Sequence, residues 1–223
     1  MTTAPEGREA PGYVSIINVA NGVTMLRFPL LVLVIWLLYQ DSAAGRMSAL
    51  GLLGLLMLMD TLDGAVARWR QETTLLGSAL DIATDRAVEI VMWVVYAHLG
   101  LIPIAVPLIV MIRGALVDSI RDVGAQRGIS AHAMMRTRLG RWLVVSPVMR
   151  TGYALVKIAA FLALALVLAL QSGGRPWTGV AEFATWATWL AVVLCLARGI
   201  PVVVEAPAFI QSMERGRGAG IRG

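Results

Sequence analysis

Four aspartates occupy two short stretches of the chain that could together hold a metal ion. Asp60 and Asp63 end one apolar run at positions i and i+3, and Asp81 and Asp85 open the next at i and i+4. In a helix, each spacing places both carboxylates on one face. Bare carboxylates in an apolar setting repel one another and resist burial, and a divalent cation removes that cost. Ligands that are all oxygen favour Mg²⁺ or Mn²⁺, and two such ions can bridge the four groups.

The elements that carry these aspartates are expected to be antiparallel helices. The link between them, residues 70–76, is short, so the helices must be neighbours and the four carboxylates meet at one end of the pair. The alternative is that the aspartates only form ion pairs with Arg68, Arg70 and Arg86. Four acids on two facing stripes, with Gly and Ala between them, favour the metal site.

Composition indicates that these helices lie in a membrane. The 223 residues are 58% hydrophobic and their mean hydropathy is +0.74, whereas soluble domains are about 45–50% apolar. A spanning helix needs about 20 mostly apolar residues. The stretches that qualify are 22–40, 47–68, 78–99, 102–122, 148–170 and 184–205. The sequence therefore predicts an all-α integral membrane protein, a bundle of six transmembrane helices forming one domain over residues 1–211.

The ends of the chain and its arginines predict how the bundle is oriented. Residues 12–20 are expected to form a short amphipathic juxtamembrane helix, and the Gly- and Arg-rich residues 212–223 a disordered basic tail. With a cytoplasmic N-terminus, only Arg46 and Arg175 fall on the outer side, as the excess of basic residues on the cytoplasmic side requires. Both termini and the aspartates are then cytoplasmic, in a multi-pass protein of the cell (inner) membrane.

Other classes fit the composition poorly. The net charge of +5 is explained by the membrane orientation, and no basic stripe with interleaved aromatics predicts nucleic acid binding. Cys195 is the single cysteine and His98 and His132 are far apart, so zinc-type spacing is absent from the sequence. A small transporter with an acidic ion site is the main rival. Its site would be expected near the midplane of the membrane, whereas these acids cluster at one edge.

The aspartate stretch resembles the signature of a known enzyme family. It reads Asp60-x2-Asp63-Gly64-x2-Ala67-Arg68-x8-Gly77-x3-Asp81-x3-Asp85. All eight positions match the signature of the CDP-alcohol phosphatidyltransferases. The resemblance implies a six-helix membrane bundle, often a homodimer, that displaces CMP from a CDP-linked lipid such as CDP-diacylglycerol.

The resemblance also implies roles for the signature residues. Asp60, Asp63 and Asp81 would ligate metal, and Asp85 would complete a second metal site and act as general base for the acceptor hydroxyl. The ions, two Mg²⁺ or Mn²⁺ in the family pattern, would neutralise the pyrophosphate of the donor.

The nucleotide site would draw on the signature and on a second, weaker motif. Gly64 lets the nucleotide approach the helix backbone, and Gly77, Arg68 and Thr74 would lie near it. Residues Asn21-x2-Thr24-x2-Arg27 resemble the family pattern that lines the cytidine site. The alternatives are helix packing for the two glycines, a cytoplasmic anchor for Arg68, and helix capping for Asn21 and Thr24.

Three further arginines are candidates for binding an anionic alcohol acceptor. Arg113, Arg150 and Arg198 lie within or at the edges of the last three spans, and intramembrane cations are costly and usually functional. The alternative is ion pairing with nearby acids, and Lys157 is the cation most expected to pair or snorkel. The acids available are Glu89, Asp118, Asp122 and Glu205.

The acceptor itself is less sharply indicated. Arg113 and the run from Ser119 to Arg121 loosely resemble phosphatidylglycerophosphate synthases, which favours glycerol 3-phosphate. Gly114 stands where those enzymes often carry glutamate, and the basic run before the fifth span is reduced to Arg150-Thr151. Inositol phosphate, serine and phosphatidylglycerol therefore remain alternative acceptors.

Overall fold

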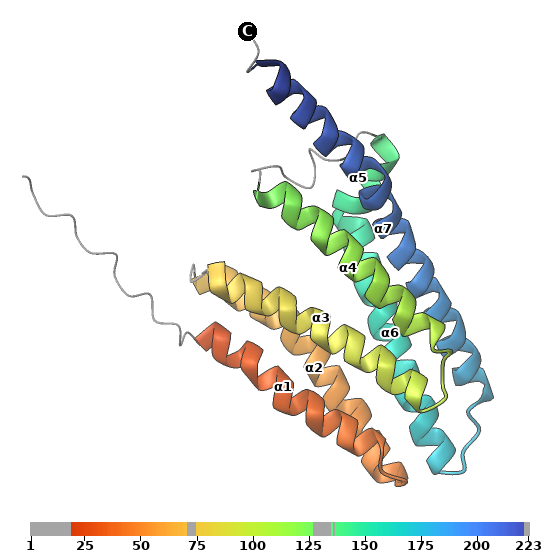
Figure 1. Cartoon of the computed structure of the whole chain (residues 1–223). Coiled ribbons are helices and arrows are strands. Elements are labelled where there is room, and N and C mark those ends of the chain that lie inside the picture. The colour runs from red at the N-terminus through yellow and green to blue at the C-terminus, as the bar shows by residue number, and fades with distance from the viewer. Residues whose placement is uncertain (1–18, 71–74, 127–134, 136, 221–223) are drawn as a thin grey trace, which may run out of the picture.

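The protein is a bundle of helices in the part of the chain that the structure describes. The computed structural model describes residues 19–70, 75–126, 135 and 137–220, all of whose regular structure is helical. The helices are α1 (Val19–Leu38), α2 (Ala43–Arg70), α3 (Leu75–His98), α4 (Ala105–Gln126), α5 (Arg138–Val145), α6 (Pro147–Ser172) and α7 (Thr178–Gly220). Figure 1 shows α3 running back in the opposite direction to α2. Helix α1 packs against both of them, and α6 packs against α2 on one side and α7 on the other.

Short turns set by a few residues connect the long helices. Gly100, between α3 and α4, and Gly174, between α6 and α7, have φ of 74° and 62°. This left-handed conformation favours glycine because it has no Cβ. Pro147 occupies the first turn of α6, where its missing N–H costs nothing.

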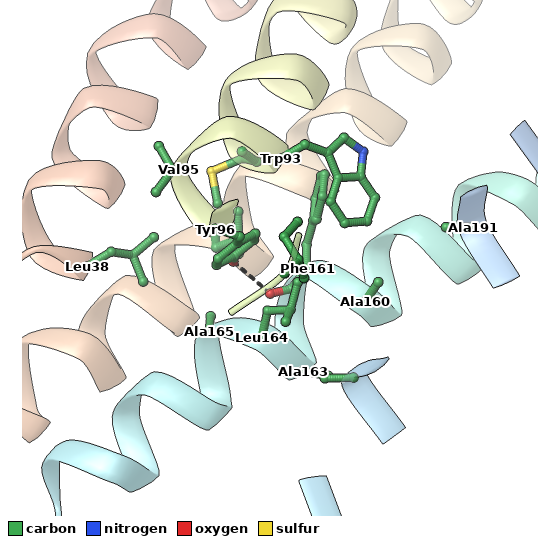
Figure 2. Close-up of a cluster of buried hydrophobic side chains, with 14 of the residues drawn as sticks. Leu38, Trp93, Val95, Tyr96, Ala160, Phe161, Ala163, Leu164, Ala165 and Ala191 are labelled. Carbon is green, nitrogen blue, oxygen red and sulfur yellow. Dashed lines mark hydrogen bonds between the residues drawn. The ribbon is translucent and has the colours of Figure 1, made fainter. Parts of the chain in front are cut away.

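An aromatic cluster fixes α3 against α6, the two helices that carry many of the candidate site residues. The rings of Trp93 and Phe161 meet edge to face, with centroids 4.6 Å apart (Figure 2). The hydroxyl of Tyr96 donates a hydrogen bond of 2.7 Å to the carbonyl oxygen of Phe161. All three side chains are fully buried. The contact satisfies the one polar atom of the Tyr96 side chain and fixes the axial register of the two helices.

The helices support a membrane location. Pro147–Ser172 and Thr178–Ala208 are long and apolar enough to cross a membrane, and Thr24–Leu38 and Ala43–Met59 are shorter apolar helices. Each of the six stretches predicted to span the membrane corresponds to a helix, α1, α2, α3, α4, α6 or α7. The number of spans itself stays a prediction.

Two segments differ from what the sequence predicts. Residues 123–147, which separate two of the predicted spans, contain the extra helix α5. Its N-cap Thr137 is held by Glu205 of α7 through hydrogen bonds of 3.0 Å and 2.6 Å. Helix α7 continues to Gly220, where a disordered tail is expected after Gln211. Helix-favouring Met, Glu and Arg follow that point in the sequence. The predicted amphipathic segment 12–20 lies almost entirely outside the described residues.

Candidate functional site

A polar cavity of about 610 Å³ lies between α3, α4, α6 and α7. Six cations and four carboxylates line it: Arg86, Arg113, Arg121, Arg150, Lys157 and Arg198, with Asp81, Asp85, Glu89 and Asp118. So many charges in one cavity of a largely apolar bundle mark a binding site, because ionisable groups inside a membrane protein are costly.

Helix α3 contributes an acidic stripe. Asp81, Asp85 and Glu89 follow one another at i, i+4 and i+8, so they share one face of the helix. The side chains of Asp81 and Asp85 are each 43% exposed, whereas Glu89 is buried. The stripe therefore runs from the open part of the cavity into its buried floor.

Each acid of this stripe faces a cation from another helix. Asp81 lies 3.7 Å from the Nη1 of Arg27, which is buried in α1. Asp85 lies 3.6 Å from the Nζ of Lys157 on α6. The same Nζ is 3.3 Å from the Oε2 of Glu89, so the expectation that Lys157 forms ion pairs is confirmed.

The acceptor candidates share this cavity. Arg113 of α4, Arg150 of α6 and Arg198 of α7 all line it, although they come from three helices. Among the described residues, the buried Nε of Arg113 and Nη1 of Arg198 have no hydrogen-bond partner. The same holds for the Nε of Arg121. Buried donors are normally satisfied, so these three arginines remain candidates for binding an anion in the cavity that they line.

A glycine makes room for one of these arginines. A Cβ on Gly199 of α7 would lie 2.7 Å from the Cγ and 2.8 Å from the Nε of Arg113. These distances are shorter than any ordinary van der Waals contact. The missing side chain at residue 199 is therefore what lets Arg113 cross from α4 into the cavity.

The second motif is only partly described. Thr24 and Arg27 are buried on α1, and Arg27 reaches Asp81 of the acidic stripe. The side chain of Asn21 lies outside the described part. The two motifs thus meet at an ion pair between α1 and α3, although Arg27 and Asp81 are more than 50 residues apart in the sequence.

The metal candidates are described only on α3. Asp60, Asp63, Gly64 and Arg68 lie on the C-terminal part of α2, and nothing is described of their side chains. Thr74 lies outside the described residues. Gly77 opens α3, and only residues 71–74 separate its helix from α2.

The described carboxylates by themselves make an incomplete metal site. Within the described range, no group of three or more His, Cys, Asp or Glu side chains could hold a metal ion. Asp81 and Asp85 have half-exposed side chains, and carboxylate oxygens are the donors that Mg²⁺ prefers. The donor chemistry of these two residues fits such an ion, with the remaining ligands expected from α2.

Several residues of the cavity were not predicted as site residues. Arg86, Arg121, Glu89, Asp118 and Tyr153 line it as well. One available signal is helical spacing, because Arg150, Tyr153 and Lys157 fall at i, i+3 and i+7 of α6 and share a face.

Comparison with protein families decides the class of the protein. The model of the CDP-alcohol phosphatidyltransferases matches residues 17–197, most of the chain. The chain belongs to the CDP-alcohol phosphatidyltransferase family. A search of curated proteins finds no significant match.

Membership fixes the type of reaction. A CDP-alcohol phosphatidyltransferase is a phosphotransferase for substituted phosphate groups, and it acts in phospholipid synthesis on a CDP-alcohol and an alcohol acceptor. The family and the two membrane-length apolar helices together indicate a membrane protein. The matched range includes both motifs and every residue of the cavity except Arg198.

Proposed function

We propose that the protein transfers a phosphatidyl group from CDP-diacylglycerol to a small phosphorylated alcohol, with glycerol 3-phosphate as the first candidate. The observation that carries this proposal is the cavity, where Arg113, Arg150 and Arg198 converge beside Asp81 and Asp85. A cation cluster next to an acidic stripe suits an acceptor that brings a phosphate and a hydroxyl into one site.

The charge of the cavity favours a phosphate monoester as acceptor. Six cations against four carboxylates leave a formal excess of two positive charges. Glycerol 3-phosphate and inositol phosphate carry up to two negative charges, whereas serine is zwitterionic and phosphatidylglycerol carries one. The charge balance therefore supports the two phosphorylated alcohols over serine and phosphatidylglycerol, and it does not separate glycerol 3-phosphate from inositol phosphate.

The chemistry is a single displacement at phosphorus. The acceptor hydroxyl attacks the phosphorus that bears the diacylglycerol, the bond from this phosphorus to the bridging oxygen breaks, and CMP leaves with that oxygen. Asp85 takes the hydroxyl proton. Its carboxylate is half exposed at the edge of the cavity, where an acceptor bound by the arginines would place its hydroxyl.

Asp60, Asp63, Asp81 and Asp85 would hold two Mg²⁺ or Mn²⁺ ions. When bound, these ions neutralise the pyrophosphate and the departing phosphate. Asn21, Thr24, Arg27, Gly64, Arg68, Thr74 and Gly77 would form the nucleotide part of the donor site. The pair of Arg27 with Asp81 supports this arrangement, because it joins the weaker motif to the acidic stripe.

The same proposal includes the membrane arrangement. We infer six spans, with both termini and the active site on the cytoplasmic side of the inner membrane; α1–α4, α6 and α7 are the six helices that would form the spans. A homodimer is the expected assembly, as in other members of the family.

Release of CMP by the purified protein tests the function. CDP-diacylglycerol and Mg²⁺ are supplied with glycerol 3-phosphate, inositol phosphate, serine or phosphatidylglycerol in separate reactions. We expect release with a phosphorylated alcohol and loss of it in excess EDTA. Absence of CMP release with every acceptor would refute the proposed transfer. Full activity in excess EDTA would refute the requirement for a metal ion.

A further inference from the structure

Glu89 forms the buried end of the acidic stripe, and the proposed reaction gives it no role. It is only 2% exposed. A buried carboxylate must be paired and hydrogen-bonded to be tolerated. Glu89 has three partners: Lys157 at 3.3 Å, Arg86 at 3.7 Å, and the hydroxyl of Tyr153, which donates a hydrogen bond to it.

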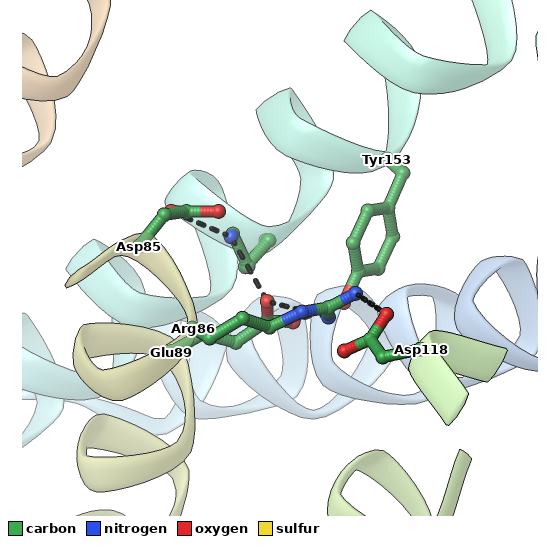
Figure 3. Close-up of polar contacts among 6 residues, drawn as sticks. Asp85, Arg86, Glu89, Asp118 and Tyr153 are labelled. Atoms are coloured by element: carbon green, nitrogen blue, oxygen red, sulfur yellow. Dashed lines mark hydrogen bonds and ion pairs between the residues drawn. The ribbon is translucent and has the colours of Figure 1, made fainter. Parts of the chain in front are cut away.

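Each partner continues to a different wall of the cavity. Lys157 also contacts Asp85 at 3.6 Å, and Arg86 contacts Asp118 of α4 at 3.3 Å. Figure 3 shows Arg86 extending from Glu89 to Asp118, with Tyr153 reaching toward the same point from α6.

The third partner connects Glu89 to an acceptor arginine. The ring of Tyr153 lies near two cations, with its centroid 5.8 Å from the Nζ of Lys157 and 5.9 Å from the Cζ of Arg198. Both distances are within the range of cation–π attraction. By fixing the hydroxyl of Tyr153, Glu89 also fixes the ring on which Arg198 of α7 rests. One buried carboxylate thus joins the walls contributed by α3, α4, α6 and α7.

We propose that Glu89 is a positioning residue that holds Lys157, Arg86 and Tyr153 so that the cavity presents its cations to an anionic acceptor. The identity of the acceptor in this proposal rests on the proposed function, whereas the binding of an anion does not. In this proposal Glu89 acts through its three partners, and not by contact with the acceptor or the donor.

Positioning and simple electrostatics predict opposite effects when the charge of Glu89 is removed. Glu89→Gln deletes a negative charge from a cavity that binds anions, so the electrostatic potential alone would tighten anion binding. Loss of positioning would weaken it, because Lys157 and Arg86 lose their common partner and Arg198 loses a fixed ring beneath it. The sign of the change therefore identifies the role.

Titration of the full-length protein with inorganic phosphate, without CDP-diacylglycerol, shows whether the substitution weakens or tightens anion binding. We expect Glu89→Gln to weaken phosphate binding about ten-fold, the size of one charge-assisted hydrogen bond. In turnover, the KM for glycerol 3-phosphate should rise by the same factor, with the KM for CDP-diacylglycerol unchanged. Asp122→Asn is the control, since it removes an exposed carboxylate one turn beyond Asp118 on α4, and its phosphate affinity should be equal or higher.

Phosphate binding by Glu89→Gln as tight as in the wild type, or tighter, would overturn the proposal, and so would absence of phosphate binding by the wild type. If Glu89→Gln does not fold, Tyr153→Phe takes its place, because it keeps every charge and the ring and removes only the hydroxyl. We expect about three-fold weaker phosphate binding, and unchanged binding would count against positioning. If phosphate binding depends on Glu89 but the wild type releases no CMP, the proposed function alone would be refuted.

Discussion

Gly199→Ala perturbs the proposed acceptor site although no charged residue is replaced. The added methyl group would lie 2.7 Å, 2.8 Å and 3.3 Å from the Cγ, Nε and Cδ of Arg113. These atoms form the stem of the side chain, so the arginine cannot yield by moving only its tip. Arg113 must adopt another rotamer, or α4 and α7 must separate, and in either case its guanidinium leaves its position in the cavity.

The size of the effect follows from the interaction that is lost. A hydrogen bond to a charged group contributes about 1.5–3 kcal/mol, which corresponds to roughly 10- to 150-fold in the KM for the acceptor. The KM for CDP-diacylglycerol should stay unchanged, because the residues proposed for the nucleotide part of the donor site belong to α1, α2, the α2–α3 link and the start of α3, whereas Arg113 lies on α4. The stability change should be small, since overpacking of about 1–3 kcal/mol is partly offset by about 1 kcal/mol of helix propensity.

Steady-state CMP release with each substrate varied in turn provides the assay. Gly179→Ala is the control on the same helix, because a Cβ there meets nothing within 4 Å, and it should behave as the wild type. An acceptor KM for Gly199→Ala within about two-fold of the wild type would show that Arg113 does not bind the acceptor from this position.

Two further substitutions test the base and the extra helix. Asp85→Asn should lower kcat by about 10²–10⁴-fold, the usual contribution of a general base, with the fold intact by circular dichroism. Asp41→Asn, which alters an exposed ion pair with Arg46, is its control. Full activity of Asp85→Asn would exclude the base assignment. Thr137→Ala removes the side-chain cap of α5 and should lower the free energy of unfolding by about 1 kcal/mol in a thermal melt. Thr185→Ala is the matched control, since its hydroxyl bonds only to the preceding turn of an exposed helix face, and equal stability of the two variants would contradict the capping role.

The signature residues and the helices could be predicted because both depend on local spacing. Apolar runs of membrane length identify helices wherever they fold, and the 3.6-residue period places Asp81 and Asp85 on one face of α3. The same period predicts a metal site where the end of α2 meets the start of α3, although the structure describes the side chains of the α3 candidates only. Local patterns could not reveal α5, because its N-cap is held by Glu205, which lies 68 residues further along the chain.

The sequence by itself determined the class of the protein, the six long helices and the acidic stretch that carries the family signature, because each depends on residues that are close together in the chain. Only the tertiary structure decided how the cations are organised. Glu89 and Lys157 are 68 residues apart and meet because Trp93 and Tyr96 pack α3 onto Phe161 of α6. Gly199 and Arg113 meet because α4 and α7 pack closely. Long-range packing brings such pairs together, and no periodicity within a single helix encodes which residue of another helix it will face.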